Sequence, residues 1–220
     1  MIHVKICGVT NWPDARAACA AGANLLGLNF YEKSLRRVST ADAAQIRGKL
    51  PPGVETVGVF VNSSPEEIAS LRSFVRFDAA QLHGDETPGI VAQVARTVPV
   101  IKAFRVDTGF ALSAFNAYPD VLAFLLDAVR AGQYGGTGLT TDWGLARRAA
   151  ASHRIILAGG LTPENVNAAI LLVRPYAVDV ASGVESRPGK KDPAKLHEFV
   201  QEVRRAESQL ESPTEESERA

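Results

Sequence analysis

The sequence predicts an α/β protein that folds as one (β/α)8 barrel, the TIM barrel. Eight short apolar runs recur along the chain, and they alternate with segments that carry the start signals of helices. The runs are apolar almost throughout, which is typical of parallel strands that are buried on both faces. A chain of 220 residues with 46% hydrophobic side chains is long enough to bury such a core in a single domain.

The eight apolar runs are the predicted strands, in chain order Ile2–Cys7, Leu25–Phe30, Thr56–Val61, Ala79–His83, Val98–Phe104, Val121–Asp127, Arg154–Ala158 and Ala177–Val180. Segments between them open with helix-capping residues, at Asn11–Asp14, Ser39–Asp42, Ser63–Glu66, Thr141–Trp143 and Thr162–Asn165. The side chain of a capping residue accepts a hydrogen bond from the first helical turn, where backbone donors otherwise lack partners. The fifth unit is the weakest, since residues 107–116 give only a short helix. An open sheet with helices on both faces is therefore an alternative.

The barrel domain is expected to span residues 1–206, followed by a tail. Residues 207–220 contain five glutamates and one arginine with almost no apolar side chain. Such a composition cannot bury enough surface to offset the entropy of ordering. We therefore expect an acidic tail that is frayed or disordered and has no catalytic role.

Charge and composition exclude several classes of partner. The chain has 24 basic and 24 acidic side chains, so no overall field favours nucleic acid or an anionic membrane. No apolar stretch approaches the length of a membrane span, and the first residues do not resemble a signal peptide, so we expect a cytoplasmic protein. The four histidines and two cysteines form no ligand motif, and no metal site is expected. Of the two cysteines, Cys19 lies in an alanine-rich segment and is interpreted as a small helix residue.

Two residues that can transfer protons end two of the predicted strands. Cys7 ends the first strand and Asp127 ends the sixth. Because the carboxyl ends of barrel strands face one pocket, a thiol and a carboxyl there can act on opposite sides of a small substrate. Lys5 is two residues before Cys7, on the same strand face, and could lower the pKa of the thiol.

Glycine-rich loops follow strands seven and eight, where barrels commonly bind phosphate. Gly159 and Gly160 lie in the first loop, and Ser182 and Gly183 in the second. Backbone amides can approach an anion closely at glycines, although either loop taken alone could be a tight turn. A third loop, which contains Gly136, could close over a substrate or simply connect two elements.

Two further candidates are a guanidinium and an imidazole. Arg36 follows the second strand and could pair with a substrate carboxylate through two hydrogen bonds, although surface arginines are usually only solvated charges. His83 ends the fourth strand, but a lone histidine is more often structural than catalytic.

An ordered set of motifs is similar to the phosphoribosylanthranilate isomerase family of tryptophan biosynthesis. The set runs from Val4 to about Asp192 and consists of Val4–Gly8, Gly27–Phe30, Lys33–Arg37, Gln81–Gly84, Tyr134–Gly138 and Val178–Glu185. The resemblance implies a cofactor-free Amadori rearrangement of a small phosphosugar-anthranilate substrate. It implies that Asp127 is the general acid, Cys7 the general base and Arg36 a ligand of the anthranilate carboxylate.

The resemblance also implies binding roles for other residues. The glycine loops after strands seven and eight match the phosphate site of the family, while Lys5, His83, Gly136 and Asp179 are expected to bind substrate. One departure is visible, because Ala181 stands where the family often has serine, which removes one hydroxyl donor. The sequence leaves the oligomeric state open.

Other functions compete with this interpretation. A related barrel isomerase of the histidine pathway performs the same rearrangement on a bulkier substrate. That enzyme resembles a system with two aspartates, so Cys7 at the end of the first strand argues against this alternative. A barrel that binds a phosphometabolite without catalysis is a second alternative. The third is that the motifs only build the barrel.

Overall fold

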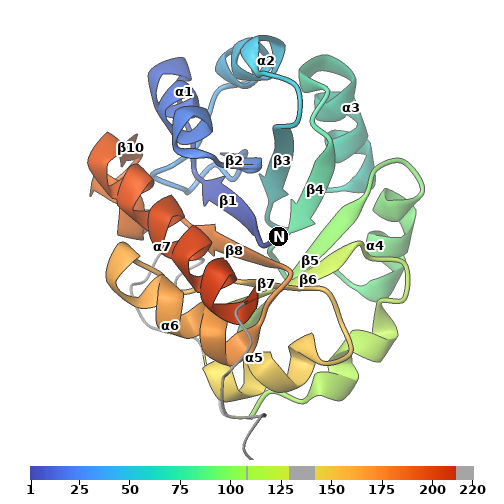
Figure 1. Ribbon diagram of the computed structural model, residues 1–220. Helices are drawn as coiled ribbons and strands as arrows, with labels where there is room; N and C mark the ends of the chain where they lie inside the picture. The colour runs from blue at the N-terminus through green and yellow to red at the C-terminus, as the bar shows by residue number, and fades with distance from the viewer. Residues whose placement is uncertain (108, 129–141, 212–220) are drawn as a thin grey trace, which may run out of the picture.

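The structure is a computed structural model that describes residues 1–107, 109–128 and 142–211. Eight parallel strands close into a barrel in sequence order (Figure 1). They are β1 (His3–Cys7), β2 (Leu25–Asn29), β3 (Glu55–Phe60), β4 (Ala79–Leu82), β5 (Val100–Val106), β6 (Ala123–Ala128), β7 (Ile155–Leu157) and β8 (Ala177–Val180). β8 pairs with β1 from His3 and Ala177 to Ile6 and Val180, so the barrel is confirmed and the open sheet is excluded.

Helices surround the barrel on the outside (Figure 1). They are α1 (Trp12–Ala21), α2 (Thr40–Lys49), α3 (Pro65–Val75), α4 (Pro88–Ala95), α5 (Trp143–Ala150), α6 (Pro163–Val173) and α7 (Pro193–Glu211). The side chains of Asn11, Ser39 and Ser64 cap the first three, each accepting a hydrogen bond from the backbone three residues later. The fifth unit has a short 3-10 helix, η1 (Leu112–Ala117). After β8 come a 3-10 turn, η2 (Ser182–Val184), and a small hairpin of β9 (Glu185–Arg187) and β10 (Lys190–Lys191).

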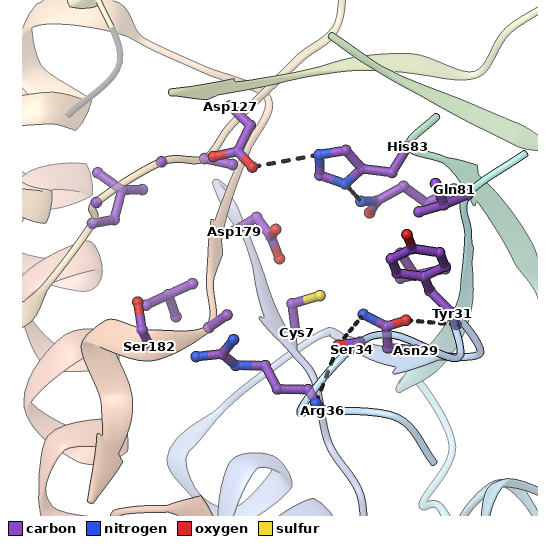
Figure 2. Close-up of a pocket in the computed structure, with 18 residues that line it drawn as sticks. Cys7, Asn29, Tyr31, Ser34, Arg36, Gln81, His83, Asp127, Asp179 and Ser182 are labelled. Atoms are coloured by element: carbon purple, nitrogen blue, oxygen red, sulfur yellow. Dashed lines mark hydrogen bonds and ion pairs between the residues drawn. The ribbon is translucent and has the colours of Figure 1, made fainter. Parts of the chain in front are cut away.

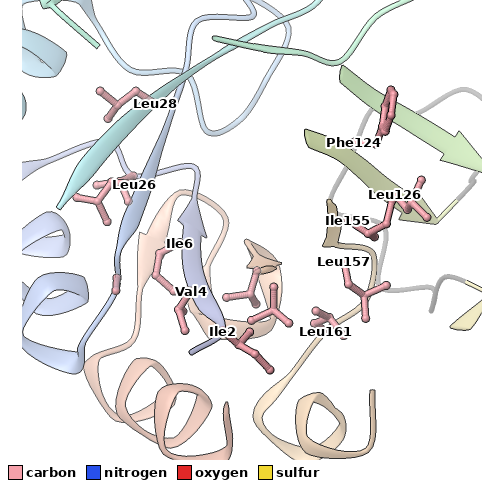
Figure 3. Close-up of a cluster of buried hydrophobic side chains, with 14 of the residues drawn as sticks. Ile2, Val4, Ile6, Leu26, Leu28, Phe124, Leu126, Ile155, Leu157 and Leu161 are labelled. Carbon is pink, nitrogen blue, oxygen red and sulfur yellow. The ribbon is translucent and has the colours of Figure 1, made fainter. Parts of the chain in front are cut away.

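The hydrophobic core has two layers, because alternate residues of a strand point to opposite sides. Outward side chains pack under the helices, as Val4 and Ile6 of β1 and Leu126 of β6 do in Figure 3. Inward side chains such as Ala123 and Leu125 of β6 fill the barrel. The outer layer is the larger and holds the helices in place.

The inward positions become polar toward the carboxyl ends of the strands. Ala177 of β8 is followed two residues later by Asp179, Ala79 of β4 by Gln81, and Leu125 of β6 by Asp127, all of them buried. Along the inward-facing positions, apolar side chains thus fill the barrel interior, and polar side chains lie toward the carboxyl ends of the strands. The polar side chains at the carboxyl ends of the strands therefore mark where the site lies.

α7 continues to Glu211, past residue 206, where the barrel domain was expected to end. Glu207 accepts a hydrogen bond from the backbone N–H of Ile2 and forms an ion pair with Arg204 at 2.7 Å. The contacts of Glu207 with Ile2 and Arg204 stabilise the helix at the start of the expected tail, in spite of the acidic composition there. Residues 212–220 lie outside the described residues. Across the described ranges, no helix combines the length and apolar character needed to cross a membrane.

Candidate active site

A pocket with about 740 Å³ of open space lies at the carboxyl end of the barrel (Figure 2). Strands β1, β2, β3, β4, β6, β7 and β8, or the loops that follow them, contribute to its lining. Eight of the residues predicted from the sequence line it, namely Cys7, Arg36, His83, Asp127, Gly159, Gly160, Asp179 and Ser182. Gly136 lies outside the described residues.

Cys7 reaches the pocket from β1, above a buried ion pair. Lys5 Nζ lies 2.9 Å from Asp179 Oδ1, and the Lys5 side chain is completely buried. Burial raises the pKa of Cys7, and the positive charges of Lys5 and Lys191 only partly oppose this effect. Lys5 acts in the expected direction, because its charge and its hydrogen bond lower the pKa of Cys7, but desolvation of the thiolate outweighs this attraction and the pKa of the thiol is raised overall.

Asp127 enters the pocket from β6 and faces His83, which follows β4. His83 Nε2 lies 3.4 Å from Asp127 Oδ2, and the Gln81 amide nitrogen is 2.9 Å from His83 Nδ1. An amide nitrogen only donates hydrogen bonds, so Nδ1 accepts and the proton of the neutral imidazole is on Nε2. Gln81 thereby directs an N–H group toward the carboxyl of Asp127. In the closed barrel β7 and β8 separate β6 from β1, so Asp127 and Cys7 approach the pocket from different sides.

Arg36 lies at the edge of the pocket in a loop that Asn29 and Ser34 organise. Asn29 donates to Ser34 Oγ at 3.1 Å, and Ser34 Oγ accepts from the Arg36 backbone at 3.1 Å. The guanidinium already has a carboxylate partner, since Nε and Nη2 donate to the two oxygens of Glu185 at 2.9 and 2.7 Å. Among the described residues no hydrogen bond uses Nη1.

The two predicted glycine loops lie next to each other at one side of the pocket. Gly159 and Gly160 adopt left-handed backbone conformations, with φ of 84° and 67°, which only glycine adopts without cost. A Cβ atom on Gly183 would lie 2.0 Å from the carbonyl oxygen of Leu161, so the loops approach this closely only with glycine there. Ser182 completes this side with a hydroxyl group that lines the pocket.

Several pocket residues were missed from the sequence. Asn29, Tyr31, Ser34 and Gln81 line the cavity as well. Gln81 could have been found, because it lies two residues before His83 on the same strand. Within residues 1–107, 109–128 and 142–211, no cluster of three or more His, Cys, Asp or Glu side chains is placed to hold a metal ion.

The fold and the pocket define a (β/α)8-barrel protein with a binding site for a small polar ligand at the carboxyl ends of its strands. A sequence model of the family described as N-(5'phosphoribosyl)anthranilate (PRA) isomerase matches residues 4–202. The chain therefore belongs to the phosphoribosylanthranilate isomerase family, and it is an isomerase.

Individual relatives agree with this family. The chain is 49% identical over 201 residues to the N-(5'-phosphoribosyl)anthranilate isomerase of Rubrobacter xylanophilus, a match that covers 91% of this chain and 98% of the relative. The crystal structure of the phosphoribosyl anthranilate isomerase of Thermotoga maritima superimposes with a TM-score of 0.86 at 42% identity, covering 93% of this chain and 99% of that one. Another structure, similar at a TM-score of 0.83 and 41% identity with the same coverage, is a phosphoribosyl anthranilate isomerase in complex with reduced 1-(o-carboxyphenylamino)-1-deoxyribulose 5-phosphate.

Proposed function

We propose that this isomerase converts N-(5-phosphoribosyl)anthranilate to 1-(2-carboxyphenylamino)-1-deoxyribulose 5-phosphate in tryptophan biosynthesis, by an Amadori rearrangement without a cofactor. The observation that carries the proposal is the arrangement of Cys7 and Asp127, which approach one pocket from different sides. The structure of one relative is a complex with a reduced form of this product, which supports the proposed substrate class.

The first step opens the sugar ring, and Asp127 is the proposed general acid. A proton from Asp127 passes to the ring oxygen, and the bond between that oxygen and C1 breaks. The nitrogen lone pair then forms a double bond to C1, which gives an iminium ion. Asp127 is buried at the carboxyl end of β6 and lines the pocket, and its Oδ2 atom lies 3.4 Å from His83 Nε2.

The second step moves a proton from C2, and Cys7 is the proposed general base. Its thiolate removes the C2 proton, the electrons of that bond form an enolamine, and the C2 hydroxyl loses its proton as C1 gains one to give the ketone. The iminium charge makes the C2 proton acidic. The same positive charge, once it lies near Cys7, stabilises the thiolate against the burial that raises the pKa of Cys7 in the free protein.

The two ends of the substrate have separate binding groups. The loops of Gly159, Gly160, Ser182 and Gly183 are the proposed phosphate site, where backbone amides and one hydroxyl can donate. Arg36 is the proposed ligand of the anthranilate carboxylate, with Glu185 holding its guanidinium in place. Ala181 supplies no hydroxyl, so the phosphate site relies more on amides.

Turnover of freshly made phosphoribosylanthranilate, in the presence of a chelator, tests this function. We expect rapid loss of the anthranilate-type fluorescence as product forms. No conversion together with tight binding of a product analogue would instead identify a barrel that binds a phosphometabolite without catalysis. If the protein neither converts phosphoribosylanthranilate nor binds the product analogue, the proposed substrate is wrong.

The substitution Gly183→Ala tests the phosphate site. The added Cβ would collide with the Leu161 carbonyl and force the two loops apart. We expect KM to rise about tenfold or more, the effect of weakening charge-assisted hydrogen bonds, with a smaller change in kcat. Gly48→Ala is the matched control, because nothing lies within 4 Å of the Cβ position at Gly48 in α2. An unchanged KM in folded Gly183→Ala protein would rule out phosphate binding at these loops.

A further inference from the structure

Lys191 of β10 is a buried cation, and two of its three hydrogen-bond partners, Cys7 and Ala181, line the pocket. Its side chain is completely buried. The ammonium donates to the carbonyl oxygen of Cys7 at 2.6 Å, to that of Ala181 at 3.0 Å and to Glu185 Oε1 at 3.0 Å. These acceptors belong to the end of β1, the loop after β8 and the start of β9. One ammonium group therefore joins the end of β1 to the segment that follows β8, which lies far from it in the sequence.

The third partner extends this connection to Arg36. Glu185 binds Lys191 through Oε1 and also accepts both hydrogen bonds from the Arg36 guanidinium. These hydrogen bonds and the positive charges hold the pKa of Glu185 below its usual range against the opposing effect of burial. The carboxylate between two cations is thus a fixed anion, and the position of Arg36 depends on it.

The contacts of the neighbouring Lys190 help to explain why the side chain of Lys191 points inward. Lys190 points away from the pocket and pairs with Asp14 of α1 at 2.6 Å, with 45% of its side chain exposed. Asp14 also accepts a hydrogen bond from the backbone N–H of Lys191 at 2.9 Å. Because Asp14 fixes the strand at this residue, the next side chain along the alternation of β10 is directed inward.

Burying an ammonium group is costly, which argues against an incidental role. Burial lowers the pKa of Lys191, while attraction to Glu185 and Cys7 opposes this effect. Buried ion pairs are often no more stabilising than apolar side chains of similar volume. The cost is better explained by the requirement that the Cys7 segment, the phosphate loop and Arg36 keep a fixed relative position.

We propose that Lys191 is a positioning residue for the isomerase reaction, which fixes Cys7 and the Ala181–Ser182 loop and, through Glu185, Arg36, while its charge favours the Cys7 thiolate. This inference rests on the proposed function for its effect on catalysis. The effect of Lys191 on the Cys7 thiol is independent of the proposed function, because the reactivity of Cys7 is measurable without substrate.

The first test measures alkylation of Cys7 by iodoacetamide as a function of pH. A Cys19→Ala background makes Cys7 the only thiol. Within the part of the chain that the structure describes, the charged groups that face Cys7 besides Lys191 are Lys5, Asp179 and Arg36. In Lys191→Met we expect the midpoint of the profile to move upward by about one pH unit, the effect of removing a nearby cation. We expect kcat to fall on the order of 10- to 100-fold because the reacting groups are misplaced. Lys190→Met is the matched control and should leave both values unchanged.

If folded Lys191→Met protein has the profile and kcat of Lys190→Met, the proposal is overturned. Circular dichroism and thermal melting show whether Lys191→Met folds. If it does not, Glu185→Gln carries the test, since it removes the charge that links Lys191 to Arg36. We expect its KM to rise about tenfold through weaker hydrogen bonds to Arg36, with exposed Glu198→Gln as the control. A KM equal to that of Glu198→Gln would then overturn the proposal.

The results also separate this inference from the proposed function. If wild-type protein does not convert phosphoribosylanthranilate but Lys191→Met still shifts the alkylation profile, the proposed function fails and the effect of Lys191 on Cys7 stands. If wild type converts the substrate and Lys191→Met changes neither property, only the positioning role fails.

Discussion

Replacement of Cys7 by serine is expected to lower kcat by about 100-fold or more, the contribution of a general base. A serine hydroxyl occupies nearly the same space in the pocket, but it ionises far less readily than a thiol. The wild-type kcat/KM should rise with pH across the neutral and alkaline range. The reason is that burial raises the pKa of Cys7, so the active thiolate is a minor form in the free protein at neutral pH and becomes more populated as the pH increases toward that pKa.

Steady-state kinetics with phosphoribosylanthranilate check this prediction, with Cys19→Ser as the matched control. Cys19 belongs to α1 and does not line the pocket. Its substitution should leave kcat and the pH profile unchanged. Near-normal turnover by the Cys7→Ser variant would show that another group removes the C2 proton.

The Asp127→Asn variant is expected to lose about 100-fold or more in kcat, because an amide keeps the shape of the carboxyl but cannot give an acidic proton to the ring oxygen. The change should act mainly on kcat. The proposed binding groups for phosphate and carboxylate lie on other strands and loops, so KM should change less.

Single-turnover measurements of ring opening, together with steady-state kinetics, test the role of Asp127. Asp107→Asn is a suitable control, because Asp107 is an exposed carboxylate that follows β5 and does not line the pocket. A variant Asp127→Asn with wild-type kcat would contradict the general-acid role. Loss of substrate binding without loss of kcat would make Asp127 a binding residue.

The fold was predictable because its signals are local. Apolar runs and capping residues together indicate the barrel, and Cys7 and Asp127 share one end because the parallel strands of a barrel all end on the same face. The continuation of α7 through Glu207 was not predictable from composition, since it depends on the partner Ile2 at the other end of the chain. The local composition of a segment does not show which tertiary contacts the segment makes in the folded protein.

The electrostatics of the site were predictable only in part. The sequence shows that Lys5 and Cys7 share a strand face, but it does not show the burial that raises the pKa of Cys7. It likewise gives no sign that Glu185 holds Arg36 or that Lys191 lies under the Cys7 backbone, because these residues are separated from their partners by long stretches of chain. Burial and long-range charge pairing arise only when the barrel closes.

The junction of β1 with β8 and α7 has a consequence for how the protein is made. β1 leaves the ribosome before the other strands of the barrel, but its neighbour β8 begins at Ala177, and the helix whose Glu207 binds Ile2 is synthesised after all eight of these strands. Contacts of such high sequence separation slow folding, since the loop between them must close before they contribute free energy. The strand that carries Cys7 is thus synthesised before the other strands of the barrel but is among the last to gain its native neighbours, so the pocket is complete only after β8 and α7 have been made.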